Sequence, residues 1–104
     1  MYALLHELIG RHGSDLYITA NSPPLLRADG VTRPISETML NAEQTRALAY
    51  SLMSECERSE FDATFELNLA IELAGAERFR INIHRQRDRV GIVARHLPSH
   101  GSGQ

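Results

Sequence analysis

The sequence contains no lysine, because all eleven of its basic residues are arginine. A phosphate-binding P-loop requires the pattern G-x-x-x-x-G-K-[ST], in which the lysine reaches the β- and γ-phosphates of a nucleotide. The absence of lysine therefore excludes such a loop from these 104 residues. It also excludes catalysis through a Schiff base on lysine.

Cysteine is nearly absent as well, and Cys56 is the one thiol of the chain. A single cysteine cannot form an internal disulfide, so a reducing compartment is the default expectation. Its neighbours Glu55 and Glu57 are acidic, whereas reactive cysteines lie in electropositive surroundings. We interpret Cys56 as structural or incidental.

Long apolar runs are also missing, since none approaches the roughly 20 residues that a membrane-spanning helix needs. Residues 1–7 lack the charged start, apolar core and cleavage site of a signal peptide. The five histidines share no metal-ligand spacing, and Pro98 argues against a helix that would join His96 to His100. We therefore expect a cytoplasmic protein without a metal site.

What the sequence does contain is a segregated distribution of charge. Residues 78–95 carry six arginines and one aspartate, a formal charge of +5, in a chain whose net charge is −2. Residues 55–77 carry seven acids and only Arg58 as a base. Arginine suits planar, bidentate recognition of phosphate or carboxylate. The basic stretch is therefore the main functional candidate, with a merely solvated sheet face as the alternative.

The pattern of apolar residues predicts one α+β domain. Alternation at 78–85 and 90–95 predicts two strands joined by a polar turn at 86–89. Asp29-Gly30 predicts a hairpin between strands at 25–28 and 31–35. Further strands are expected at 16–19 and 67–73, and helices at 1–11, at 41–53 and from residue 54. The order α-β-β-β-α-α-β-β-β predicts an antiparallel sheet of about six strands with helices on one side.

Small polar residues mark the ends of these helices. Asn41 with Gln44, and Ser54 with Glu57, have the spacing of a capping box. Gly13 is expected to be the left-handed residue that ends the first helix. Ser14-Asp15 is interpreted as turn and cap chemistry, with Asp15 bonding backbone amides. Residues 96–104 show no pattern.

Four motifs occur in a characteristic order: Gly13-Ser14-Asp15-Leu16-Tyr17-Ile18, Pro23-Pro24-x-x-Arg27-x-Asp29-Gly30, Arg78-Phe79-Arg80-Ile81-Asn82 and Gly91-Ile92-Val93-Ala94-Arg95-His96-Leu97-Pro98. Together they resemble the N-terminal domain of the type IV pilus retraction (twitching motility) ATPases, within the secretion ATPase superfamily. The resemblance covers residues 1–99 and implies a PAS-like sheet domain, with residues 100–104 as a tail or the start of a linker. Tyr17 departs from the family, which often has histidine there.

The resemblance also implies a function. Members of this family form hexameric rings, and ATP with Mg²⁺ sits on a C-terminal RecA-like domain that the 104 residues do not include. Two N-terminal arginines fifteen residues apart reach the terminal phosphate, and by position these are Arg80 and Arg95. A salt bridge to Glu72 or Glu77 is the alternative role for either one. The remaining arginines of the stretch are weaker candidates, namely Arg78, Arg85, Arg87 and Arg89.

The implied partners are the RecA-like domain of the same or a neighbouring subunit, five further copies in a homo-hexamer, and the inner-membrane pilus platform protein. The chain would be a cytoplasmic regulatory and assembly domain with no catalytic residue. Alone it is expected neither to turn over ATP nor to carry bound nucleotide. One alternative is a free-standing PAS-like module for a small ligand or a protein. Nucleic-acid binding is disfavoured by the net negative charge and by the scarcity of aromatic residues beside the arginines.

Overall fold

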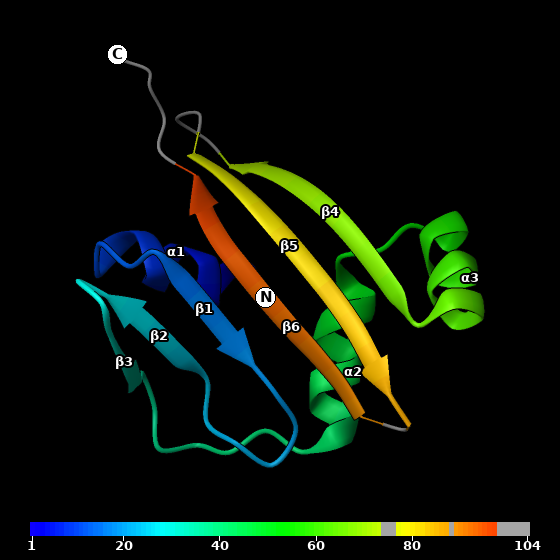
Figure 1. The fold of residues 1–104 in the computed structure, drawn as a ribbon, viewed down its shortest axis with the longest axis horizontal. Helices are drawn as coiled ribbons and strands as arrows, with labels where there is room; N and C mark the ends of the chain where they lie inside the picture. Colours follow the sequence, from blue (N-terminus) through cyan, green and yellow to red (C-terminus); the bar gives the residue numbers. More distant parts are fainter. Residues whose placement is uncertain (74–76, 88, 98–104) are drawn as a thin grey trace.

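The computed structural model describes residues 1–73, 77–87 and 89–97. Six strands form one sheet, and helices lie against it (Figure 1). The elements in chain order are α1 (Tyr2–Gly10), β1 (Asp15–Ile18), β2 (Leu25–Ala28), β3 (Val31–Pro34), α2 (Ala42–Ser51), α3 (Glu55–Thr64), β4 (Glu66–Leu73), β5 (Glu77–Gln86) and β6 (Arg89–Leu97). The predicted α+β class and element order are confirmed.

The strands pair in the order β3-β2-β1-β6-β5-β4, and every neighbouring pair is antiparallel. The last strand, β6, therefore lies between β1 from the start of the chain and β5 (Figure 1). Residues 96 and 97 were predicted to show no secondary-structure pattern, and this is wrong. Strand β6 continues through both residues, which pair with Phe79 and Arg78 of β5. The predicted tail or linker at 100–104 lies outside the described residues.

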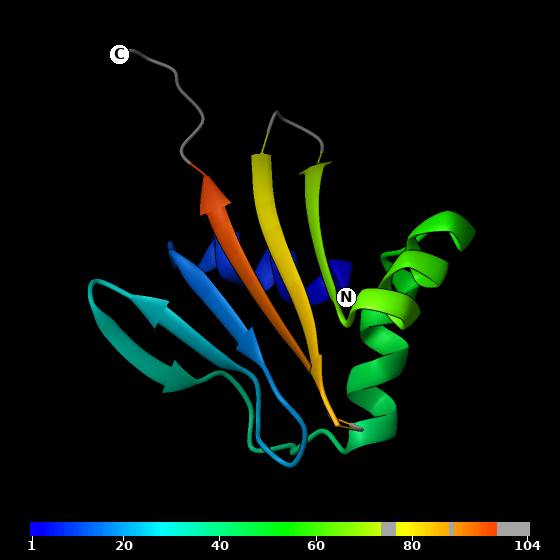
Figure 2. The ribbon, with the colours of Figure 1, turned by 45° about the vertical axis from the view of Figure 1, so that its right-hand side comes forward.

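One face of the sheet carries the core. Helices α1 and α2 lie on the same side of the sheet (Figure 2), where α1 contacts β1 and β6 and α2 contacts β6. Across the central strands, Leu16 lies opposite Ala94, and Ala94 lies opposite Ile81; all three are fully buried. Successive residues of a strand alternate between faces. Their neighbours in sequence therefore point to the other side, which we call the open face.

The two predicted capping boxes and the predicted Asp29-Gly30 hairpin are confirmed. Asn41 accepts a hydrogen bond from the Gln44 backbone N–H at 2.7 Å, and the Gln44 side chain accepts from the Asn41 backbone N–H at 2.9 Å. The second capping box, at the start of α3, is formed in the same way. Asp29 and Gly30 have φ angles of 54° and 77°. Both lie in the left-handed region that a two-residue hairpin of type I′ requires.

The predicted role of Gly13 is wrong. The left-handed residue after α1 is His12, with φ 56°, and the Gly13 N–H closes the helix by donating to the Leu8 carbonyl at 2.9 Å. A Cβ on Gly13 would lie 2.7 Å from a methyl carbon of both Leu8 and Leu26, and 3.1 Å from the Arg27 carbonyl oxygen. Gly13 is therefore required by close packing between the end of α1 and β2.

We expect Gly13→Ala to lower the free energy of unfolding by about 2 kcal/mol, because the added methyl group overpacks two buried leucines. Gly10→Ala is the matched control, since a Cβ there meets no atom within 4 Å, and alanine should raise the free energy of unfolding by about 0.5 kcal/mol. Urea denaturation followed by circular dichroism measures both. Equal effects of the two substitutions would contradict the packing role.

Candidate functional site

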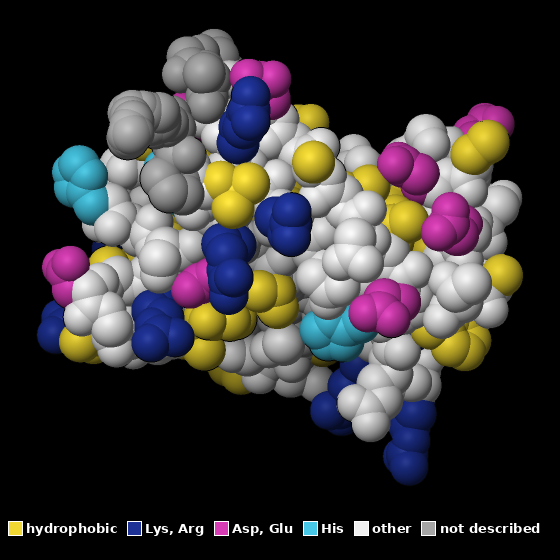
Figure 3. Space-filling view, turned by 45° about the horizontal axis from the view of Figure 1, so that its top comes forward, with side chains coloured by type: hydrophobic (Ala, Val, Ile, Leu, Met, Phe, Trp, Pro, Cys, Tyr) yellow, Lys and Arg dark blue, Asp and Glu magenta, His cyan; other side chains and the backbone are white. Residues whose placement is uncertain are grey.

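Four charged residues form one row across the open face. Arg27 of β2 lies opposite Asp15 of β1, and Asp15 also lies opposite Arg95 of β6. Arg95 in turn lies opposite Arg80 of β5. Neighbouring strands are about 4.8 Å apart, so the row spans roughly 14 Å. We call it the arginine row, and Figure 3 shows basic side chains gathered over the middle of this face.

The two predicted phosphate ligands are direct neighbours in this row. Residues directly opposite each other in an antiparallel pair have Cβ atoms about 5 Å apart, so Arg80 and Arg95 can both reach one anion. Both are exposed, and 69% of the Arg95 side chain is accessible to solvent. Like charges placed directly opposite each other are destabilising. The pair is therefore destabilising for the domain by itself, and it favours an anionic ligand.

Asp15 is the counter-charge that the sequence analysis missed. Its Oδ1 accepts a hydrogen bond from Arg95 Nε at 3.3 Å, and its Oδ2 accepts one from Ser14 Oγ at 3.0 Å. Only 9% of the side chain is exposed. The prediction that Asp15 bonds backbone amides is wrong, because it lies inside β1 and its hydrogen-bond partners among the described residues are side chains.

The alternative partners predicted for the two arginines are not observed. Glu77 contacts the ring of His96, and Glu72 lies opposite Arg78, two residues before Arg80 in β5. Within the described residues, the ion pairs include one of Arg95 with Asp15 and none of Arg80. Arg80 is therefore the arginine of the pair that has no carboxylate partner among the described residues.

A second row beside the arginines is uncharged. Tyr17 lies opposite Val93, and Val93 lies opposite Asn82; all three are half-buried. Asn82 donates to the Asn68 side-chain oxygen at 2.9 Å. The arginine row thus borders a row of uncharged side chains, so no carboxylate of that second row competes with an anion for the arginines.

Three other arginines of the basic stretch, Arg85, Arg87 and Arg89, lie at the far end of the β5–β6 hairpin. Arg85 lies over the ring of Phe65, 5.1 Å from its centre, and donates through Nε to the Arg87 carbonyl at 2.6 Å. Arg89 lies opposite Gln86 at the end of the hairpin. These three arginines surround the β5–β6 turn, away from the arginine row.

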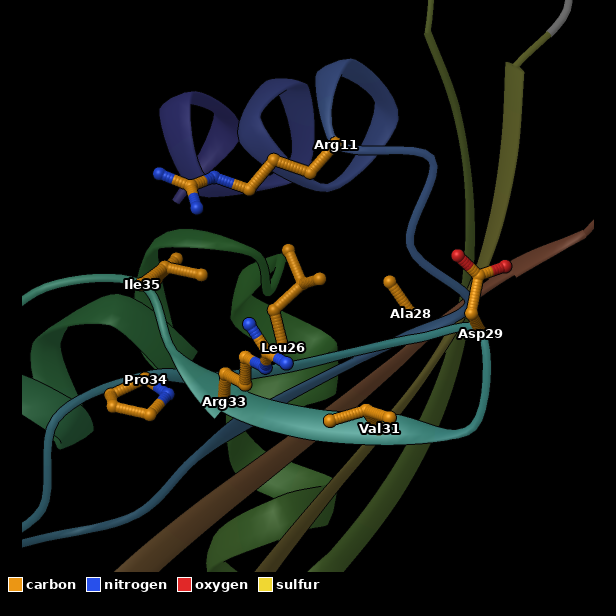
Figure 4. A pocket seen from close by; sticks show the side chains of 8 residues that line it. All are labelled: Arg11, Leu26, Ala28, Asp29, Val31, Arg33, Pro34 and Ile35. Carbon is orange, nitrogen blue, oxygen red and sulfur yellow. The ribbon is translucent and has the colours of Figure 1, made fainter.

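A surface hollow of about 420 Å³ lies on the helix side of the sheet, between α1 and the β2–β3 hairpin. Arg11 extends over it from α1, while Leu26, Val31 and Arg33 lie along its floor (Figure 4). Leu26 and Arg33 are opposite each other in the β2–β3 pair. The hollow is therefore separated from the arginine row by the sheet itself.

Other kinds of site find little support in the part of the chain that the structure describes. There, no group of three or more His, Cys, Asp or Glu residues could hold a metal ion. None of the described helices is long and apolar enough to cross a membrane. Cys56 is exposed and unpaired on α3. The arginine row remains the strongest candidate.

Comparison with known proteins decides the family. The type IV pilus ATPase PilU of Pseudomonas aeruginosa is 39% identical over 94 residues, which are 90% of this chain and 25% of the relative. The type IV pilus retraction ATPase PilT of the same organism is 37% identical over 86 residues, 83% of this chain and 25% of the relative. The chain belongs to the type IV pilus retraction ATPase family. The resemblance predicted from the four motifs is confirmed.

A solved structure supports the same assignment. The crystal structure of the pilus retraction motor PilT with bound ADP matches with a TM-score of 0.82 and 34% identity, over 93% of this chain and 29% of that one. The chain corresponds to the N-terminal domain of these ATPases and spans about a quarter of the length of the two curated relatives. No protein-family model matches it.

We expect the two row arginines to affect stability in opposite directions. Arg80→Gln should raise the free energy of unfolding by about 0.5 kcal/mol at low salt, because it removes a like-charge neighbour of Arg95. Arg95→Gln should lower it by about 1 kcal/mol, because the nearly buried Asp15 loses its ion-pair partner. Urea denaturation at low and high ionic strength measures both. The same sign for the two substitutions would contradict the described pairing.

Proposed function

We propose that this chain is the N-terminal regulatory and assembly domain of a pilus retraction ATPase, and that Arg80 and Arg95 contact the terminal phosphate of ATP. The observation that supports it most directly is the pairing of these two exposed arginines on neighbouring strands of an open sheet face. Two guanidinium groups on adjacent strands can share one phosphate, and each can donate two parallel hydrogen bonds to it.

The nucleotide must be held by another domain, because these 104 residues contain no lysine and hence no P-loop. In the proposed complex a C-terminal RecA-like domain, of the same or a neighbouring subunit, binds ATP and Mg²⁺ and presents the phosphates to the open face. The arginines would stabilise the charge that spreads over the phosphoryl oxygens in the transition state. The chain alone would bind nucleotide weakly and hydrolyse none.

The sheet also explains how the domain could transmit the state of the nucleotide. Arg80 and Arg95 lie in β5 and β6, which pair along nine residues each, and β6 is in turn paired with β1. Loss of the terminal phosphate would therefore release the whole sheet as one rigid body rather than a loop. Such rotations would be repeated around a homo-hexamer at the cytoplasmic side of the pilus platform protein. In this way the domain would pass the state of the nucleotide on to the rest of the motor.

A second candidate function is a free-standing module that binds a small ligand. The observation that favours it is the hollow between α1 and the β2–β3 hairpin, where two arginines lie beside apolar side chains. An amphipathic anion would suit this composition. The hollow is open to solvent, however, and ligand sites usually enclose most of the ligand.

We expect Arg80→Ala and Arg95→Ala each to reduce ATP turnover of the full-length protein about a hundredfold, because each removes a donor from the transition-state charge. Arg78→Ala is the matched control. It removes an arginine from the same strand and the same face but outside the arginine row, and it should leave turnover within about twofold. Steady-state turnover at saturating ATP measures all three. ATP hydrolysis by the 104-residue chain itself, or indifference to both row substitutions, would refute the proposal.

A further inference from the structure

We propose that Asp15 is a positioning residue that holds the Arg95 side chain ready for the phosphate. This inference rests on the proposed function of the arginine row. Asp15 would not touch the ligand. It would act through Arg95, by fixing the direction in which the guanidinium group points before any anion arrives.

Asp15 is itself held firmly. It lies in β1, which is paired on one side with β2 and on the other with β6. Its carboxylate is nine-tenths buried and accepts a hydrogen bond from Ser14 Oγ at 3.0 Å. A carboxylate fixed by the backbone of a central strand and by a neighbouring hydroxyl can serve as a rigid anchor for a longer, exposed side chain.

The contact uses only one edge of the guanidinium group. Asp15 Oδ1 accepts from Arg95 Nε at 3.3 Å, while the two terminal nitrogens of Arg95 make no hydrogen bond to another described residue. A guanidinium group has five N–H donors in a planar fork. The carboxylate and a phosphate would therefore bond different donors of the same group, and Asp15 would orient Arg95 without competing for it.

A positioning role and a mere counter-ion role predict effects of opposite sign. If Asp15 only neutralises charge, its removal makes the open face more positive and an anion should bind more tightly. If Asp15 positions Arg95, removal of Asp15 leaves the Arg95 side chain flexible. The ligand must then immobilise that side chain, and the lost conformational entropy lowers the affinity. Anion binding should then become weaker, although the domain has gained a positive charge.

The test is titration of the 104-residue chain with inorganic tripolyphosphate at low salt, followed by NMR. We expect Asp15→Ala to weaken binding about fivefold, the effect of leaving one long side chain to be ordered by the ligand. The Arg95 Nε–H resonance should lose its protection from solvent exchange in the variant. Glu72→Ala is the matched control, because it also removes an acid that lies opposite an arginine on the open face, and it should not weaken binding.

The outcomes separate this inference from the proposed function. Weaker binding in Asp15→Ala, with an unchanged Glu72→Ala control, supports positioning; unchanged or tighter binding, while Arg95→Ala still weakens it, overturns positioning alone. Binding that ignores Arg95→Ala refutes the phosphate role and positioning with it. If Asp15→Ala does not fold, Asp15→Asn keeps the shape of the side chain, and its binding is judged by the same signs.

Discussion

The pairing of β1 with β6 is the contact on which the rest of this domain depends. It joins a strand near the start of the chain to the last strand, and so it fuses the β1–β3 and β4–β6 halves into one sheet. On the core face it sets Leu16 beside Ala94, and on the open face it sets Asp15 beside Arg95. Without this pairing, two three-stranded pieces would remain, and Arg95 would have no counter-charge.

The core and the arginine row are enforced by the same register. A slip of one residue in β6 would turn Ile92 and Ala94, now almost fully buried, toward solvent and would drive Arg95 toward the helices. Burial of apolar surface is worth roughly 25 cal/mol per Å², which is about 1.5–3 kcal/mol for a fully buried side chain such as that of Ile92. That is far more than the fraction of a kcal/mol lost by placing two arginines opposite each other. The packing of one face thus holds an electrostatically unfavourable arrangement on the other.

Local signals explain why so much of the fold was predictable. Capping boxes, the Asp29-Gly30 turn and strict alternation act within a few residues, and the opposition of Arg80 and Arg95 follows from a hairpin whose turn is short. The pairing of Asp15 with Arg95 links residues eighty positions apart, and no local pattern specifies which strands become neighbours. The role of Gly13 was misassigned for the same reason, because it depends on the distant Leu26.

The charge balance of the arginine row shows why an anion and the sheet should stabilise each other. Three arginines against one carboxylate leave the row with a formal charge of +2, on a chain whose total is −2. An anion bridging Arg80 and Arg95 removes their repulsion while the core keeps the strands in register. Binding and folding are linked: an anion that stabilises the folded sheet is bound more tightly by the folded sheet than by the unfolded chain, by the same free energy. Because both arginines are exposed on the open face, a phosphate can reach them without disturbing the core.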